Sequence, residues 1–200
     1  MFTNDILASF DNIGVISLPA DKWIVSTVKD TVYRSLMMTN RFNGHLRFPY
    51  SVMDHSLNVA NYAADLYSIF AEDYSERGRD EVFLMGLLHD ISESITGDVI
   101  YPMKDKLVWN RMSAFEKEFR RWFLEYCYGF NYKWNDELYD KYVNRADREF
   151  GVLELIGVSD NPHFISTALM EKLFTNKSGD ASSVCYDNIV FLAIKRLENK

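Results

Sequence analysis

Glycine and proline are scarce in this sequence, and cysteine is scarcer still. The 200 residues contain 9 glycines, 4 prolines and 2 cysteines. So little glycine and proline excludes a collagen-like or low-complexity chain. The two cysteines, Cys127 and Cys185, form no metal-type pair and no disulfide framework, which is typical of a protein in a reducing compartment. We therefore expect a cytoplasmic location.

Long hydrophobic runs and the common short catalytic motifs are also missing. No apolar stretch approaches the roughly 20 residues that a membrane helix needs, and residues 1–5 lack the basic start of a secretory signal. The sequence has no glycine-rich phosphate loop, no dinucleotide fingerprint, no His-Glu-x-x-His and no Gly-x-Ser-x-Gly. We expect no membrane partner, and any catalysis must use another kind of site.

Positive charge is in deficit, because 22 lysines and arginines face 29 aspartates and glutamates, a net charge of −7. A surface of this sign repels polyanions, so no nucleic acid polymer is expected as a partner. A small anionic ligand remains compatible with the sequence where a few cations or a metal ion converge. The composition, 48% hydrophobic and 26% charged, is that of a globular protein with a sizeable core.

Helical periodicity, by contrast, is abundant. A first helix is predicted after Pro19 by an apolar stripe with helical spacing: Ile24, Val28, Val32 and Leu36. Ser51 and Asp54 have the spacing of a capping box and predict the start of a second helix, which should end in the charged segment 72–80. A third helix, over about residues 81–93, is apolar nearly all round and is predicted to lie at the centre of a bundle.

The same periodicity indicates later helices near residues 105–128, 136–157, 162–174 and 182–198. Gly129 is a stop signal for the first of these. No segment shows sustained apolar–polar alternation, and neither a repeat nor a linker divides the chain. We therefore predict an all-α helical bundle that forms a single domain over residues 1–200.

Among the four histidines, His89 stands beside Asp90 at the end of the most apolar predicted helix. Burying an imidazole and a carboxylate there is unfavourable unless both are compensated, and a metal ion compensates both. Glu93 follows on the same predicted helical face and Asp98 comes soon after it. A His-Asp dipeptide alone is a weak signal, but this concentration of groups favours a catalytic or metal site over a solvated helix end.

His55 and Asp147 lack such a context. A histidine inside an amphipathic helix is more often a core or boundary residue than a ligand, and Asp147 lies among arginines with which it can pair on an exposed face. Periodicity alone therefore favours an ordinary structural place for both residues.

Taken together and in this order, these residues resemble the HD-domain superfamily of metal-dependent phosphohydrolases. The closest resemblance is to the 5′-deoxynucleotidase branch and to phage-encoded relatives that hydrolyse deoxynucleoside triphosphates. It rests on residues 50–57 (Tyr-Ser-Val-Met-Asp-His-Ser-Leu), residues 87–98 (Leu-Leu-His-Asp-Ile-Ser-Glu-Ser-Ile-Thr-Gly-Asp) and the later Pro-Met-Lys of residues 102–104. The resemblance covers about residues 20–157 and implies an HD-type helical bundle, leaving the C-terminal helices of residues 160–200 unconstrained.

The resemblance implies a metal site and two acid–base groups. Its matched positions make one divalent ion, which could be Mn, Co, Fe, Ni or Zn, bound by His55, His89, Asp90 and Asp147. Glu93 is the candidate to position or deprotonate the attacking water. Asp98 would share that role or protonate the leaving alkoxide.

The matched positions also imply substrate contacts. Arg41 offers a planar fork for two phosphate oxygens, and Lys104 offers a point charge. Phe42 or Tyr50 could stack on the base. Similar deoxynucleotidases often carry tryptophan after the arginine, where its bulk crowds the sugar 2′ position. Because phenylalanine stands there in this chain, weaker selectivity for deoxyribose is expected.

We therefore predict a hydrolase of 2′-deoxynucleotides, foremost a 5′-deoxynucleotidase that releases phosphate from deoxynucleoside monophosphates. One alternative is a triphosphohydrolase acting on a nucleotide such as dATP at the same site, with Arg47, Lys106 and Arg111 as additional cations. A second alternative is a catalytically silent helical module that binds nucleotides. The resemblance also implies a homo-oligomer and is compatible with a phage-encoded protein.

Overall fold

The computed structural model describes residues 22–41, 50–98, 106–158 and 183–199. The regular secondary structure in these ranges is entirely helical, which confirms the predicted all-α class. The described ranges contain no strand, only an isolated antiparallel bridge between Asn40 and Ser51. This bridge joins the segment after the first helix to the start of the second.

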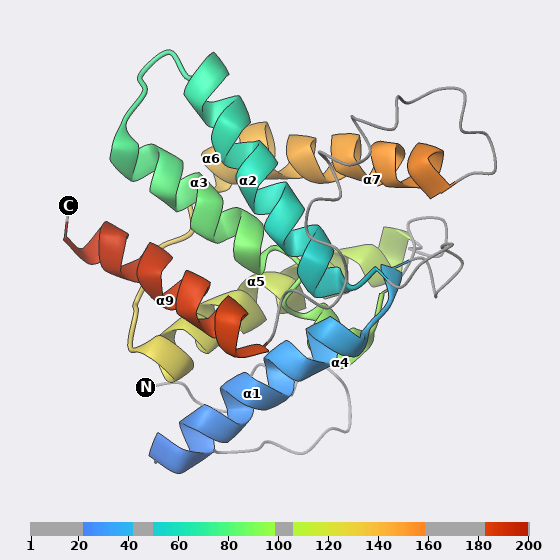
Figure 1. The fold of residues 1–200 in the computed structure, drawn as a ribbon, viewed down its shortest axis with the longest axis vertical. Coiled ribbons are helices and arrows are strands. Elements are labelled where there is room, and N and C mark those ends of the chain that lie inside the picture. Colours follow the sequence, from blue (N-terminus) through green and yellow to red (C-terminus); the bar gives the residue numbers. More distant parts are fainter. Residues whose placement is uncertain (1–21, 42–49, 99–105, 159–182, 200) are drawn as a thin grey trace.

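Two helices, α2 (Val52–Phe70) and α3 (Glu76–Leu88), lie side by side at the centre of the molecule (Figure 1). The predicted capping box at the start of α2 is confirmed. The Ser51 hydroxyl accepts from the Asp54 N–H at 3.1 Å, and the Asp54 carboxylate accepts from the Ser51 N–H at 3.2 Å. The central position predicted for α3 is also confirmed, since its last two turns contain side chains with no exposed surface: Leu84, Met85, Leu87 and Leu88.

Both ends of α3 differ from the prediction. The helix begins at Glu76, inside the charged segment 72–80, because the Ser75 hydroxyl caps it by accepting from the Gly78 N–H at 3.0 Å. It ends at Leu88, where the chain tightens into turns, and Glu93 opens a separate short helix, α4 (Glu93–Thr96). The spacing had predicted that His89 and Glu93 share one helical face. This prediction is wrong, because the two residues do not belong to one continuous helix.

The first helix and the long helix that begins at residue 106 agree with the periodicity. α1 is Lys22–Met38 and α5 is Lys106–Tyr128. Gly129 follows α5 with a φ of +65°, a conformation that glycine adopts without strain, and so ends the helix where predicted.

The predicted helix near residues 136–157 is present but irregular. It consists of α6 (Asp136–Leu138), a π-helical turn (Tyr139–Val143) and α7 (Asn144–Val158), and periodicity gave no sign of the π-helical turn. α9 (Ser183–Glu198) corresponds to the last predicted helix. The helix predicted near residues 162–174 lies outside the described residues.

Packing around the central pair forms two adjoining cores. One joins α1, α5 and α9 to α2 and α3, and the other joins α7 and the π-helical turn to the opposite side of the same pair (Figure 1). Because α2 packs against both α3 and α7, side chains from these three helices come together where the two cores adjoin.

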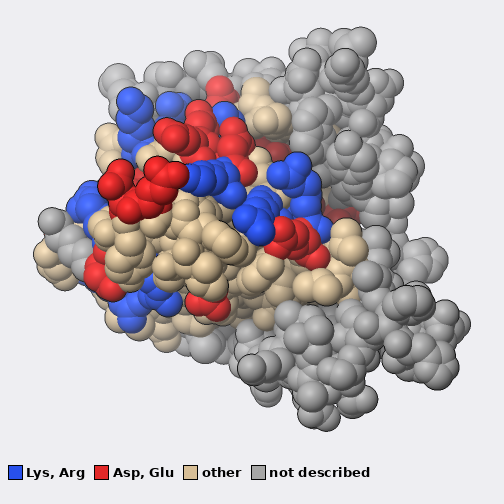
Figure 2. All heavy atoms as spheres, turned by 90° about the horizontal axis from the view of Figure 1, so that it is seen from above, with Lys and Arg blue, Asp and Glu red and all other residues tan. Residues whose placement is uncertain are grey.

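No helix in the described ranges is long and apolar enough to cross a membrane. On the face drawn in Figure 2, the described basic side chains lie next to acidic ones and form no continuous basic patch.

Candidate active site

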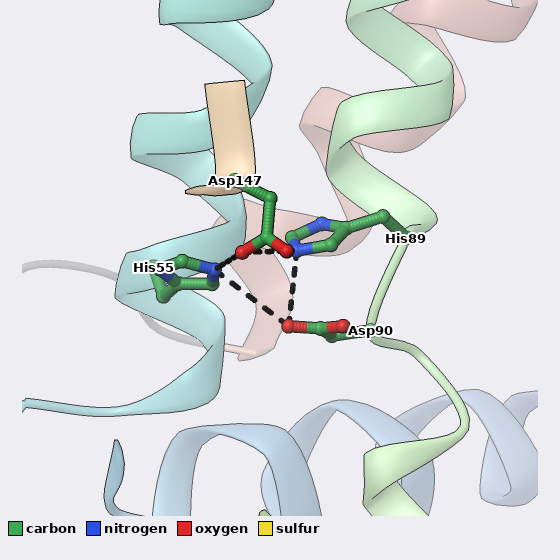
Figure 3. Close-up of side chains that lie close together, drawn as sticks. All are labelled: His55, His89, Asp90 and Asp147. Carbon is green, nitrogen blue, oxygen red and sulfur yellow. Dashed lines mark hydrogen bonds and ion pairs between the residues drawn. The ribbon is translucent and has the colours of Figure 1, made fainter. Parts of the chain in front are cut away.

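Two histidines and two aspartates meet where α2, the end of α3 and α7 come together (Figure 3). Each offers one ligand atom, and the four atoms lie within 4.8 Å of one another: those of His55, His89, Asp90 and Asp147. The shortest separations are 2.9 Å between His89 Nε2 and Asp90 Oδ2, and 3.0 Å between His55 Nε2 and Asp147 Oδ1. The cluster could hold a metal ion, and it includes the two residues that periodicity had favoured as ordinary structural ones.

Hydrogen bonds turn both imidazole rings so that Nε2 faces the cluster. His89 Nδ1 donates to the Gly86 carbonyl at 2.8 Å, and His55 Nδ1 lies 2.7 Å from Glu154 Oε1. A carbonyl oxygen only accepts, so the proton of a neutral His89 ring is on Nδ1 and the lone pair is on Nε2. His89 Nε2 is buried and faces two carboxylates of the cluster, with Asp90 Oδ2 at 2.9 Å and Asp147 Oδ1 at 3.8 Å. This is the arrangement that a metal-ligating histidine needs.

The charges in the cluster keep its carboxylates ionised. Burial opposes ionisation of Asp90, but the charges of His89, His55 and Arg41 outweigh it and lower the pKa of this carboxyl. Burial likewise opposes ionisation of Asp147, and the hydrogen bond from His55 and the charge of His89 lower its pKa. Two carboxylates that stay charged at neutral pH are suited to a cation.

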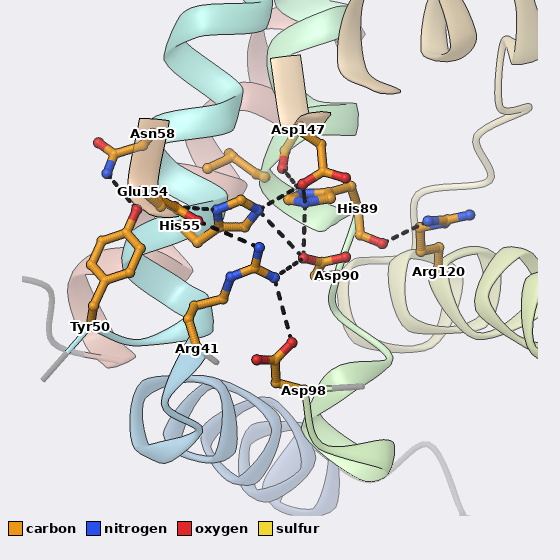
Figure 4. A network of polar contacts seen from close by, with 12 residues as sticks. Arg41, Tyr50, His55, Asn58, His89, Asp90, Asp98, Arg120, Asp147 and Glu154 are labelled. Carbon is orange, nitrogen blue, oxygen red and sulfur yellow. Dashed lines mark hydrogen bonds and ion pairs between the residues drawn. The ribbon is translucent and has the colours of Figure 1, made fainter. Parts of the chain in front are cut away.

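Arg41 lies directly beside the cluster (Figure 4). Its backbone N–H donates to the Tyr50 carbonyl at 2.9 Å, which fixes this residue next to the start of α2. The guanidinium Nη1 is 3.5 Å from Asp90 Oδ2 and 3.7 Å from Asp98 Oδ1, and Nη2 is 3.5 Å from Glu154 Oε2. A planar cation in this place could bind phosphate oxygens next to a metal ion.

Glu93, the candidate acid–base group, is buried at the start of α4, and its Oε2 has no hydrogen-bond partner among the described residues. Burial raises the pKa of this carboxyl well above its ordinary value, and the charge of Asp90 adds to the effect while Arg41 opposes it. Asp98 follows α4 and lies against Arg41. The structure therefore brings both candidates to the edge of the cluster.

Sequence reasoning missed Glu154, a side chain with no exposed surface on α7. Its Oε1 bonds His55 Nδ1 and its Oε2 faces Arg41, so it contacts both the candidate ligands and the candidate phosphate-binding cation. A signal was present in the sequence. Glu154 is the only charged residue in the segment Gly-Val-Leu-Glu-Leu-Ile of residues 151–156, and it lies seven residues after Asp147, on the same face of a helix.

Of the remaining candidates for substrate contact, one is buried and the others lie outside the described residues. Tyr50 is only 1% exposed and its hydroxyl accepts from Asn58 Nδ2 at 2.9 Å, so it belongs to the buried network and is not available to stack on a base. Phe42 and Lys104 lie outside the described residues. So do three further cations, or their side chains: Arg47, Lys106 and Arg111.

Comparison with known proteins identifies the family. A protein-family model described as 5′-deoxynucleotidase YfbR-like matches residues 32–156, which is more than half of the chain and includes every residue of the cluster. Searches among curated proteins and among solved structures gave no significant match. The matched segment begins within α1, ends within α7 and contains Arg41, Glu93, Asp98 and Glu154 as well. From the extent of this match, the chain belongs to the YfbR-like 5′-deoxynucleotidase family.

Proposed function

We propose that this protein is a metal-dependent 5′-deoxynucleotidase that converts deoxynucleoside 5′-monophosphates into deoxynucleosides and phosphate. The observation that carries the proposal is the convergence of two imidazoles and two carboxylates within 4.8 Å, with Arg41 3.5 Å from one of the carboxylates. Membership of the YfbR-like family supports the substrate class. A site for a cation beside a site for a phosphate is what such a reaction needs.

The donor set fits a single divalent ion, such as Mn, Co, Fe, Ni or Zn, held by His55, His89, Asp90 and Asp147. The buried Nε2 of His89, which faces the carboxylates of Asp90 and Asp147, supports this assignment. When bound, such an ion polarises a phosphoryl oxygen and lowers the pKa of water. Burial and Arg41 lower the pKa of His55, but Glu154 and Asp147 outweigh them and raise it to about 10, so the ring is doubly protonated at neutral pH without a metal ion. Binding therefore also requires that His55 give up the proton on Nε2, while Glu154 keeps the proton on Nδ1 in place.

Three side chains around the cluster bind the substrate and transfer protons. Arg41 binds two oxygens of the substrate phosphate and offsets their charge in a carboxylate-rich pocket. Glu93 accepts the proton of the attacking water, since its raised pKa makes it a stronger base than an ordinary carboxylate. Asp98 shares this transfer or protonates the 5′ oxygen as the P–O bond breaks.

Product analysis tests the proposal directly. The protein is stripped with a chelator, reloaded with Mn²⁺ or Co²⁺, and incubated with dAMP, dCMP, dTMP and dATP. We expect the monophosphates to yield inorganic phosphate and the deoxynucleoside, resolved by chromatography. Triphosphate released from dATP in the absence of monophosphate turnover would identify a triphosphohydrolase instead. Metal binding without turnover of any nucleotide would identify a silent binding module.

Two substrate controls sharpen this assay. The 3′-phosphate isomer of dAMP should not be hydrolysed if the enzyme is specific for the 5′ position. AMP should be hydrolysed more slowly than dAMP, but with a modest difference, because Phe42 stands where similar enzymes often carry tryptophan. The Phe42→Trp variant should widen that difference.

A further inference from the structure

Side chains from three elements hold the carbonyl groups at the C-terminal end of α3. The Gly86 carbonyl accepts from His89 Nδ1, and the Leu87 carbonyl accepts from the hydroxyl of Tyr186 on α9. The His89 carbonyl accepts from Arg120 Nη1 of α5 at 2.7 Å (Figure 4). The last carbonyls of a helix have no partner within the helix, so these bonds fix the backbone that presents His89 and Asp90.

Arg120 is unusual among these three because it is a buried cation. The residue is 3% exposed and, among the described residues, no carboxylate lies within ion-pair distance of it. Its guanidinium carbon lies 5.0 Å from the ring centre of Trp134 and 5.1 Å from that of Tyr139. Two aromatic faces and the negative end of the α3 dipole compensate a charge that would otherwise be unfavourable to bury.

The same guanidinium group also reaches the element that precedes α7. Arg120 Nη1 donates to the Tyr139 hydroxyl at 3.2 Å, and Tyr139 begins the π-helical turn that runs directly into α7 and Asp147. One side chain therefore connects the segment that carries His89 and Asp90 with the segment that leads to Asp147. No hydrogen bond or ion pair joins Arg120 to a ligand side chain among the described residues.

We propose that Arg120 is a positioning residue for the metal site. Its bonds to the His89 carbonyl and the Tyr139 hydroxyl set the separation between the two segments that supply three of the four ligands, and so set the affinity and coordination geometry of the site. This inference rests on the proposed metal-dependent function. It predicts an effect on the bound ion that a residue serving only global stability would not produce.

The test compares Arg120→Met with Lys117→Met in the full-length protein. Met keeps much of the length and apolar surface of the arginine but removes its charge and donors. Lys117 lies one turn earlier on α5, is 52% exposed and pairs with Asp136, so it controls for loss of a cation from the same helix. The measurements are the dissociation constant of Co²⁺ by calorimetry and the visible absorption of the Co²⁺ form.

We expect Arg120→Met to bind Co²⁺ about 10- to 100-fold more weakly, as is usual when a partner of a metal ligand is removed. The visible spectrum should change, and excess Co²⁺ should restore much of the kcat. Lys117→Met should bind Co²⁺ like the wild type. Arg120→Lys, which keeps the charge but not the planar fork, should lie between the two.

The outcomes separate this inference from the proposed function. Wild-type protein that binds no Co²⁺ would overturn both. Wild-type and Arg120→Met proteins with equal affinity and identical spectra would overturn the role of Arg120 alone. If Arg120→Met does not fold, Tyr139→Phe removes only the hydroxyl that Arg120 contacts. A several-fold loss of Co²⁺ affinity in that variant would then support the role, and an unchanged affinity would overturn it.

Discussion

Gly86 of α3 lies against Ala60 of α2 so closely that a Cβ at position 86 would be 2.5 Å from the Ala60 Cα and 3.0 Å from its nitrogen. The two helices could not keep this distance with any larger residue at the crossing. His55 lies five residues before Ala60 and His89 three residues after Gly86, and the centres of the two imidazole rings are 5.2 Å apart. The crossing of α2 and α3 thus sets the distance between two candidate ligands.

The Gly86→Ala substitution should therefore destabilise the protein and disturb the site. We expect a loss of about 1–3 kcal/mol in unfolding free energy, as in other overpacked cores, together with weaker metal binding. Urea unfolding and calorimetry with Co²⁺ measure the two effects. Gly151→Ala in α7 is the control, because a Cβ there meets no atom within 4 Å and should stabilise the helix slightly. Equal stability of the two variants would contradict the close crossing.

Removal of a candidate ligand should abolish metal binding while leaving the fold largely intact. His89→Ala or Asp90→Ala deprives the cluster of one of four donor groups, so both bound metal and phosphate release should be lost. Metal content by mass spectrometry, hydrolysis of dAMP and far-UV circular dichroism test this together. Near-normal turnover in either variant would refute the ligand assignment.

Glu93→Gln should separate chemistry from metal binding. The amide has the shape of the carboxyl group but cannot accept a proton from water, so kcat should fall by about 10²–10⁴-fold with the metal content unchanged. The rate of dAMP hydrolysis and the bound metal are measured on the same preparation. If both fall together, Glu93 is a ligand or a structural residue instead.

Glu154 should govern metal affinity through His55. Glu154→Ala leaves His55 Nδ1 without its acceptor and Arg41 without one of its carboxylates, and we expect about 10- to 100-fold weaker metal binding. Glu154→Gln keeps an oxygen for Nδ1 and should lose less. Glu149→Gln, on the same helix but 39% exposed, is the matched control and should bind metal normally.

The contact between α1, α5 and α9 should make the protein sensitive to alkali. Tyr33 and Tyr128 hydroxyls lie 2.5 Å apart, and Tyr128 donates to Asp187. Burial is the main cause that raises the pKa of both tyrosines above the ordinary value, and it raises the pKa of Cys127 to about 12. The folded state therefore holds these protons more tightly than the unfolded state does. The contribution of these groups to the free energy of unfolding is fully present at neutral pH. It falls as the pH rises above their pKa values in the unfolded state, about 8.5 for cysteine and about 10 for tyrosine.

Tyrosinate absorbance and circular dichroism recorded from pH 7 to pH 12 check this expectation. The late-titrating tyrosines should ionise together with loss of helix. In Tyr128→Phe, the fall in stability with pH should be shallower by about 1.4 kcal/mol per pH unit, the contribution of one proton. Ionisation of all 12 tyrosines near pH 10 with the helices intact would contradict the buried network.

Local signals predicted the parts of the site that lie in one stretch of sequence. Ser51 and Asp54 predicted the start of α2, and the apolar run before His89 predicted a buried helix that ends in polar groups. The charged residues 76–80 were wrongly predicted to lie between helices, because the first turns of a helix tolerate charge and Ser75 caps them. Composition alone does not distinguish such turns from a linker.

Long-range partners could not be found in this way. Arg120 stands in an amphipathic helix beside Arg121, and nothing local marks one of them as buried against the end of α3. The sequence signal for Glu154 was weak, a single acidic residue in an apolar stretch. Its partner His55 lies 99 residues away, and that pairing follows from the tertiary packing of α7 on α2.

A single helix, α7, contacts both nitrogens of the His55 ring, because Asp147 lies at Nε2 and Glu154 at Nδ1. Seven residues span nearly two turns of a helix, so Asp147 and Glu154 lie on the same face of α7. Inserting or deleting one residue in the preceding π-helical turn would rotate both by about 100°. Both carboxylates would then lose their contacts with the His55 ring at once, so we expect the arrangement to depend on the length of that turn.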